Sequence, residues 1–336
     1  MAIGKQTNFN LVEIIVGLAR FAVLCFALVL TAVCISNFAL FSPNWPFGLF
    51  ASFSLYLIFV SPIFVLICII AWRKSLMVLL PLGVVAFYPF YDFKKYDFAT
   101  KDDCQTIECL TLVSVNLHHD IEALKRVSKI SRAFETDLFL LMDLPYDLSE
   151  TKLRALYPFH PNVRVFARTR DGKPLGSAMA VVSKDRATDL ELIEDNLDSD
   201  DFNLRGLIRF SYPGELNQPI DIFIIHPMMP LAKNGMTYRD KLIDRAVSEI
   251  GESENFILVG DFNLTPWEPK FKTLPGIRAE NPRWISTWDA SRAWLRLPID
   301  HVMVGRGIQT VESEVLPSVG SDHYPIYTVV TRRRTN

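Results

Sequence analysis

Three short motifs in the last quarter of the chain carry acidic, amide and imidazole side chains in a fixed order. They are Gly260-Asp261-Phe262-Asn263, Pro298-Ile299-Asp300-His301 and Gly320-Ser321-Asp322-His323. Each motif stands at the end of an apolar run, where a buried sheet would hold its polar side chains rigidly. Together they supply three carboxylates, one amide and two imidazoles. Such a set can hold a hard divalent cation and move protons around a phosphate.

Three earlier polar residues also follow apolar runs that predict buried strands. They are Asn116, Asp143 and His226, which follow the runs 110–115, 137–142 and 220–225. Asp261 and Asn263 are two residues apart in extended chain, so their side chains face the same side.

Each motif also has an interpretation without catalysis. Asp261 to Asn263 suits a turn that caps the following segment, Asp322 and His323 suit a surface loop, and His226 suits a hydrogen-bonded strand end. Three further histidines fit structural roles better. His301 would pack beside the site, and His118 and His119 would lie in a solvated loop, with the lining of the pocket as the alternative for these two.

The rest of the chain after residue 108 alternates strand and helix patterns. Asp120 can cap a helix that continues to about Glu135, and Thr237–Ser253 is a second helical segment. Strand patterns come in pairs between them, which favours an α+β fold of two sheets packed face to face with helices outside. The intervening segments 144–161, 184–205 and 264–297 carry no substrate signature; 184–205 is a polar, acidic stretch.

The N-terminal part is almost without charge. Phe21–Trp72 is an uncharged run of 52 residues and Ser75–Tyr91 one of 17, whereas a spanning helix needs about 20 apolar residues. The sequence therefore predicts a bundle of about three transmembrane helices before the soluble domain. We expect spans at about 19–41, 47–72 and 75–91, a membrane anchor at 1–91, a linker at 92–107 and a catalytic domain at 108–332.

Flanking charges suggest an orientation. Lys5 and Arg20 precede or open the first span, and Arg73-Lys74 separate the second from the third. The positive-inside rule then puts the N-terminus in the cytoplasm. With three spans, we expect an integral membrane protein whose catalytic domain lies outside the cytoplasm. If the third segment, interrupted by Pro81, does not span, the domain is cytoplasmic.

The net charge of the domain limits the classes of binding partner, and its cysteines bear on the cellular compartment. The chain has 35 basic and 37 acidic residues, of which the anchor contains four basic and one acidic. Residues 92–336 therefore contain 31 basic and 36 acidic residues, a net charge of −5. A domain of this sign has no general attraction for nucleic acid. Cys104 and Cys109 stand just before the first strand and could form a disulfide outside the cytoplasm, or remain two thiols.

The order of these polar residues resembles that of the endonuclease/exonuclease/phosphatase superfamily, the deoxyribonuclease I-like enzymes. The similarity covers about residues 108–332 and is closest to the bacterial membrane-anchored, YafD-like branch, which implies location in a bacterial inner membrane. It implies a four-layer α/β sandwich and magnesium-assisted hydrolysis of phosphoesters, with Mn²⁺ as an alternative metal.

The resemblance also implies roles for individual residues. Asp261 would orient and deprotonate the attacking water, and Asn263 would hold a phosphate oxygen as charge builds. His323 would contact the scissile phosphate, with Asp300 fixing its tautomer. Asn116 would brace Asp261 or hold a phosphate oxygen. His226 would contact phosphate or help to protonate the leaving oxygen. Asp143 and Asp322 would be the metal ligands.

One position departs from the family pattern. The family usually has Glu where this chain has Asp143, which keeps the charge but is one methylene shorter. Because Mg²⁺ tolerates retained waters, the shorter side chain predicts an altered metal site rather than a lost one.

Three functions are therefore open. The first is a membrane-anchored, Mg²⁺-dependent phosphodiesterase or phosphatase acting on lipid or small phosphoester substrates. The second is a membrane-tethered nuclease acting on DNA or RNA, against which the acidic balance counts. The third is a catalytically degenerate protein that binds a phosphorylated ligand.

Overall fold

The structure is a computed structural model in which two compact units are distinguished, Met1–Asp92 with Trp267–Pro269 and Phe93–Pro266 with Lys270–Asn336. It describes residues 11–36, 45, 51–53, 56, 109–145, 148–170, 173–193, 206–213, 219–279, 286–292 and 296–333.

In the first unit the main described element is helix α1, Leu11–Ser36. Its side chains are described for residues 13–29. No helix in the described part of the chain is long and apolar enough to cross a membrane. The predicted spans at 47–72 and 75–91 lie almost wholly outside the described residues, so the three-span anchor stays a prediction.

The second unit contains two mixed sheets of six strands each. The first sheet runs in the order β11 (Ile308–Val315), β12 (Ile326–Arg332), β1 (Cys109–Asn116), β2 (Leu138–Met142), β4 (Lys173–Ser183) and β3 (Asn162–Arg170). The second runs in the order β5 (Thr188–Ile193), β6 (Gly206–Tyr212), β7 (Ile220–His226), β8 (Phe256–Asp261), β10 (Asp300–Val304) and β9 (Ile277–Arg278).

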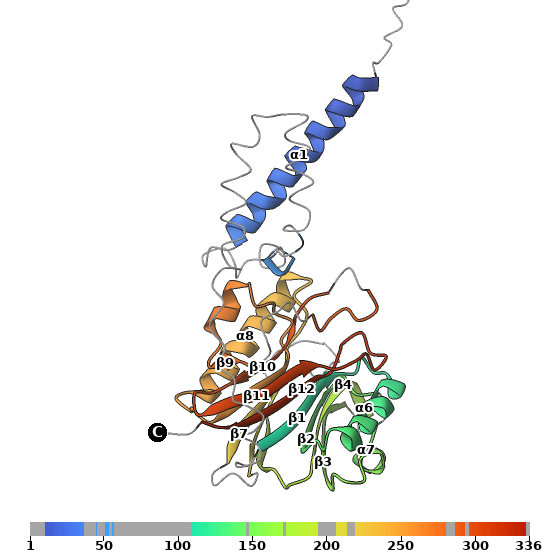
Figure 1. The fold of residues 1–336 in the computed structure, drawn as a ribbon, viewed down its shortest axis with the longest axis vertical. Helices are drawn as coiled ribbons and strands as arrows, with labels where there is room; N and C mark the ends of the chain where they lie inside the picture. The colour runs from blue at the N-terminus through green and yellow to red at the C-terminus, as the bar shows by residue number, and fades with distance from the viewer. Residues whose placement is uncertain are drawn as a thin grey trace, which may run out of the picture. The chain divides into compact units, whose positions relative to one another are not determined.

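Helices cover the outer face of each sheet, as Figure 1 shows. Helices α6 (Ile121–Ala133) and α7 (Glu150–Leu156) share a buried apolar cluster with the first sheet. Helix α8 (Lys233–Ile250) shares another with the second sheet. A third cluster, with side chains from both sheets, fills the space between them. The predicted arrangement of two packed sheets flanked by helices is confirmed.

Helix α6 forms where the sequence supplies both a cap and an apolar face. The Asp120 carboxylate accepts hydrogen bonds from the backbone N–H groups of Glu122 and Ala123, which satisfies two donors of the first turn. Leu124 and Val127 are fully buried against the sheet. Their spacing is that of one helical face.

Two crossovers through helices decide where the polar strand ends lie. The β1 and β2 strands are parallel and joined through α6, and β7 and β8 are parallel and joined through α8. Carboxyl ends of parallel neighbours meet at the same edge of a sheet. In each sheet an antiparallel neighbour begins at the same edge. Asp300, the first residue of β10, pairs with Asp261 at the end of β8. Ile326, the first residue of β12, pairs with Ser114 near the end of β1.

Some elements differ from the expectation. Helix α8 begins at Lys233 rather than at 237, and the polar stretch 184–205 contains the edge strand β5. Helix α7 lies within 144–161, and strand β11 precedes the last strand. Cys109 is disulfide-bonded; Cys104 lies outside the described residues.

Candidate active site

The two C-terminal motifs meet the first one at a buried cluster of three residues. His323 Nδ1 donates to Asp300 Oδ2 at 2.8 Å, and His323 Nε2 lies 3.8 Å from Asp261 Oδ2. All three side chains are buried, at 3–6% exposure. The imidazole therefore lies between two carboxylates, one hydrogen-bonded to it and one facing its other nitrogen.

Two hydrogen bonds hold the Asp261 carboxylate, and the glycine before it lets the strand approach β7. Asn116 Nδ2 donates to Asp261 Oδ2 at 3.1 Å, and the Asn263 backbone N–H donates to Asp261 Oδ1 at 2.9 Å. The preceding Gly260 has φ +145°, and a Cβ on it would lie 2.0 Å from the Ile225 carbonyl oxygen. Only glycine fits there, so the strand can bring Asp261 close to the end of β7.

His226 lies at that end of β7 and is fully buried. Its Nε2 is 3.8 Å from Asp261 Oδ2, and its Nδ1 is 3.6 Å from Asp143 Oδ1. Both distances exceed that of a hydrogen bond. Asp143 has a left-handed φ of +46°, a conformation that non-glycine residues seldom adopt outside functional or tightly constrained turns. The ring of His226 thus separates Asp261 from Asp143.

Asp322 has partners of its own. Trp288 Nε1 donates to Asp322 Oδ2 at 3.0 Å, and His118 Nδ1 lies 2.7 Å from Asp322 Oδ1. The His118 side chain is 64% exposed. The sequence favours a solvated loop for His118, and the structure places it on the solvent side of Asp322.

Two residues that are not among the predicted site residues order this region. Thr287 Oγ1 accepts from the backbone N–H groups of Ile299 and Asp300, at 3.2 and 3.1 Å. Ser321 Oγ donates to the Asn116 carbonyl at 2.8 Å and accepts from the His323 N–H at 3.1 Å. The only sequence signal for Ser321 was its position in the third motif, and Thr287 had none.

The predicted site residues are thus gathered at one edge of the two sheets, except that Asn263 turns its amide to the Pro227 carbonyl at 3.2 Å. His301 lies beside the cluster: its Nε2 donates to the Leu264 carbonyl at 2.7 Å, and its ring packs on Phe262 and Phe271. Burial holds the pKa of His301 well below its usual value.

The pKa values of the central pair are shifted upward. Burial raises the pKa of Asp261 and the charge of Asp300 raises it further, while His323 and His226 oppose the shift. Burial by itself would lower the pKa of His323, but the charges of Asp300 and Asp261 outweigh it and raise that pKa to about 10. Asp261 is therefore a stronger base than an ordinary carboxylate, and His323 is an imidazolium at neutral pH.

The raised pKa of His323 predicts a pH dependence of stability. The pKa of His323 is 6.5 in the unfolded chain and about 10 in the folded protein. Protonation of His323 therefore stabilises the folded state fully at pH values below 6.5. This contribution is lost as the pH rises through the higher of these two pKa values. We expect the free energy of unfolding to decrease over this interval, and to decrease less in Asp300→Asn. Chemical denaturation at several pH values measures both slopes; equal slopes would contradict the assignment.

Among the described residues, one group has the geometry to hold a metal ion: Asp261, Asp300 and His323 place one ligand atom each within 4.8 Å of one another. A protonated His323 has no lone pair to offer, since metal ligands must be deprotonated. The carboxylates fit better, and Asp300 Oδ1 is buried without a hydrogen-bond partner among the described residues. Oxygen ligands suit a small hard cation. The predicted ligands Asp143 and Asp322 are not in this group, and their role stays a prediction.

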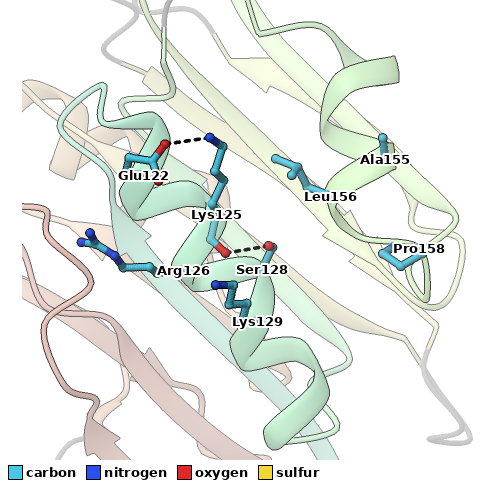
Figure 2. A pocket seen from close by; sticks show the side chains of 8 residues that line it. All are labelled: Glu122, Lys125, Arg126, Ser128, Lys129, Ala155, Leu156 and Pro158. Atoms are coloured by element: carbon cyan, nitrogen blue, oxygen red, sulfur yellow. Dashed lines mark hydrogen bonds and ion pairs between the residues drawn. The ribbon is translucent and has the colours of Figure 1, made fainter.

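A cavity of about 370 Å³ lies elsewhere, between α6 and α7 (Figure 2). Its lining combines Lys125, Arg126 and Lys129 with Leu156 and Pro158. In Figure 2 Lys125 turns toward Glu122 and Arg126 turns away from α7, so the cations do not converge on one point. None of the predicted site residues lines this cavity.

Comparisons with known proteins agree with the arrangement. A model of the "Endonuclease/Exonuclease/phosphatase family" matches residues 113–323. The structure of a protein of that description from Bacteroides vulgatus has a TM-score of 0.54 at 16% identity, covering 67% of this chain and 99% of that chain. The structure of a protein of the same description from Beutenbergia cavernae has a TM-score of 0.52 at 16% identity, covering 67% of this chain and 72% of that chain.

D. rerio TDP2, in a complex with a single-stranded DNA product, gives a TM-score of 0.51 at 16% identity, covering 67% of this chain and 99% of that one. None of the curated proteins matches the sequence. At these identities the structural likenesses concern the fold alone.

Proposed function

Because the chain belongs to the endonuclease/exonuclease/phosphatase family, we propose that it is a membrane-anchored, Mg²⁺-dependent hydrolase of phosphodiesters or phosphomonoesters. Members of the family are phosphoester hydrolases, typically dependent on a metal, which sets the class of reaction. The observation that carries the proposal is the buried Asp261 carboxylate with Asn116, His226 and the His323–Asp300 pair around it.

Asp261 is the base in this proposal. Its raised pKa makes it able to take a proton from a water that attacks phosphorus. Asn116 and the Asn263 N–H hold its two oxygens, so the carboxylate keeps one orientation while the proton moves. The new bond joins the water oxygen to phosphorus, and the ester P–O bond breaks.

Positive and polar groups around Asp261 stabilise the charge that this step builds. In this proposal the His323 imidazolium, kept protonated by Asp300, contacts one phosphate oxygen. The Asn263 amide, which also donates to the Pro227 carbonyl, contacts another through its second N–H. The departing oxygen needs a proton, and His226, buried on the other side of Asp261, is the group we assign to it.

For the metal, we propose Asp143 and Asp322 as the residues that hold Mg²⁺, near Asp261. The ion would neutralise phosphate charge and polarise the P–O bond. Asp143 approaches His226 at 3.6 Å, so its carboxylate faces the site despite its shorter side chain.

Lengthening Asp143 tests its assignment. We expect Asp143→Glu to lower the Mg²⁺ concentration required for half-maximal activity by about tenfold, because the carboxylate then reaches the ion directly rather than through a water. Titration of activity against free Mg²⁺ measures the shift. Asp244→Glu, an exposed acid paired with Lys270, is the control and should leave the titration unchanged. An unchanged titration in Asp143→Glu would remove Asp143 from the metal site.

The membrane part of the proposal is supported by the uncharged runs 21–72 and 75–91. The disulfide at Cys109 is typical of oxidising compartments, and with the positive-inside argument it favours a catalytic domain outside the cytoplasm. Anchoring would keep the site near the bilayer, which raises the effective concentration of lipid or envelope phosphoesters. The net charge of −5 after residue 91 favours these over nucleic acid.

The experiment is a hydrolysis panel with the full chain in detergent, with Mg²⁺ and with EDTA. The panel contains phospholipids including sphingomyelin, small phosphomonoesters, a chromogenic phosphodiester, DNA and RNA. We expect Mg²⁺-dependent turnover of lipid or small phosphoesters. Preferential cleavage of DNA or RNA would replace this substrate class with the nuclease alternative.

A further inference from the structure

Arg239 is the largest fully buried side chain in the described part of the chain, with 1% exposure. It lies on α8, in the helical layer outside the second sheet. A guanidinium is costly to bury unless its charge is paired and its N–H groups donate hydrogen bonds. Its partners therefore indicate what the charge is used for.

The guanidinium connects α8 to the candidate active site. Arg239 Nε donates to the carboxylate of the neighbouring Asp240 at 2.9 Å, which balances the charge. Arg239 Nη1 donates to the backbone carbonyl of Asn263, also at 2.9 Å. The Nε atom of Arg239 is thus fixed to a residue of the same helix, and its Nη1 atom reaches the turn that follows β8.

The turn at Asn263 needs such support. Asn263 has a left-handed φ of +48°, which is unfavourable for a residue with a side chain. Its backbone N–H donates to Asp261 and its side-chain amide donates to the Pro227 carbonyl. Arg239 holds the remaining backbone polar group of Asn263, the carbonyl, and it is the one cation among these three partners.

Helix α8 also contacts the chain after His226. A Cβ on Gly235 would lie 2.2 Å from the Met229 carbonyl oxygen, so this first part of the helix approaches the 227–229 segment as closely as glycine allows. The same helix therefore packs on the segment after β7 and, through Arg239, supports the turn after β8. These are the two strand ends that carry His226 and Asp261.

We infer that Arg239 is a positioning residue for hydrolysis: by holding the Asn263 carbonyl, it fixes the turn that orients the Asn263 amide and the N–H that binds Asp261. The inference rests on the proposed function. It gives a role in turnover to a residue on the outer helical layer that does not contact the substrate.

The test uses the full chain and a chromogenic phosphodiester. In Arg239→Met we expect kcat to fall about tenfold to hundredfold, because a small displacement of a reacting group can cost that much, with little change in KM. Arg239→Lys keeps the charge and one donor, so its loss should be smaller, about threefold to tenfold. The control is Arg245→Met on the same helix, whose side chain is 56% exposed and paired with Glu249; its kcat should equal that of the parent.

A double-mutant cycle separates positioning from a general effect on the fold. Asn263→Ala removes the amide that Arg239 helps to orient but keeps the backbone N–H that binds Asp261. Arg239→Met should therefore reduce kcat in the Asn263→Ala background by a factor about threefold smaller than in the parent. The same factor in both backgrounds would overturn the inference, as would a lowered Tm with unchanged kcat. If Arg239→Met does not fold, Arg239→Lys is carried through the same cycle.

Asp261→Ala distinguishes failure of this inference from failure of the proposed function. Full activity in Asp261→Ala would remove the proposed site and the role of Arg239 with it. An inactive Asp261→Ala alongside fully active Arg239 variants would overturn the inference alone.

Discussion

Asp261→Ala is expected to lower kcat/KM by about a thousandfold, the largest effect we predict. The change removes the general base, which contributes about 10² to 10⁴ in rate. It also removes one of the three carboxylates that raise the pKa of His323. Steady-state kinetics at saturating Mg²⁺ measure the loss, with circular dichroism and Tm to follow the fold.

The same substitution at an exposed acid away from the site, Asp244, is the control for this result. Asp244 is exposed and paired with Lys270, so Asp244→Ala should keep the activity of the parent. Asp261→Asn preserves the shape of the side chain and should be as inactive as the alanine variant. Activity within about tenfold of the parent in either Asp261 variant would refute Asp261 as the base.

His323→Ala is expected to lower kcat by about a hundredfold to a thousandfold, the range seen when one donor to a developing charge is removed. Asp300→Asn should have a smaller effect in the same direction, because it leaves the imidazole but lowers its pKa and loosens its orientation. The order of the two losses is therefore part of the prediction. Kinetics across neutral to alkaline pH should show the activity of Asp300→Asn declining at a lower pH than that of the parent.

A buried histidine away from the site provides the control. His160 is 1% exposed and its Nε2 donates to the Thr136 carbonyl at 2.7 Å, so His160→Ala should lower Tm while the folded fraction keeps its kcat. If His323→Ala behaves like His160→Ala, with lost stability and retained kcat, His323 is structural. A larger loss in Asp300→Asn than in His323→Ala would also contradict the assigned roles.

The predicted site residues come together because most of them follow apolar strands. In a parallel pair the polar residue after each apolar run lies at the same edge, which brings Asn116 of β1 close to Asp143 after β2, and His226 of β7 close to Asp261 of β8. This relation between sequence and space needs only the strand pattern and the crossover rule.

Residues without such a pattern could not be predicted. Thr287 lies in an irregular segment, and its hydroxyl meets Asp300 only through the tertiary fold. The pairing of exposed His118 with Asp322 joins positions 204 residues apart, as their numbers show. Arg239 has no sequence signal of its own, and only its burial distinguishes it from an exposed arginine such as Arg245 on the same helix.

The missed elements have similar causes. Strand β5 is an edge strand whose exposed positions include Asp189 and Glu191, so its composition is that of a polar loop. Charged residues on an edge strand are expected because they discourage pairing with other chains. Helix α7 is only seven residues long, too short to give a clear helical period.

The most direct test of the central claim, water attack on phosphorus at the Asp261 site, is hydrolysis of a phosphoester by the full chain in isotopically labelled water with Mg²⁺. The best substrate of the panel would be used, and the label located by mass spectrometry. We predict label in the phosphate product, none in the alcohol, and no product with EDTA or with Asp261→Ala. Label in the alcohol, or undiminished turnover in Asp261→Ala, would contradict the account.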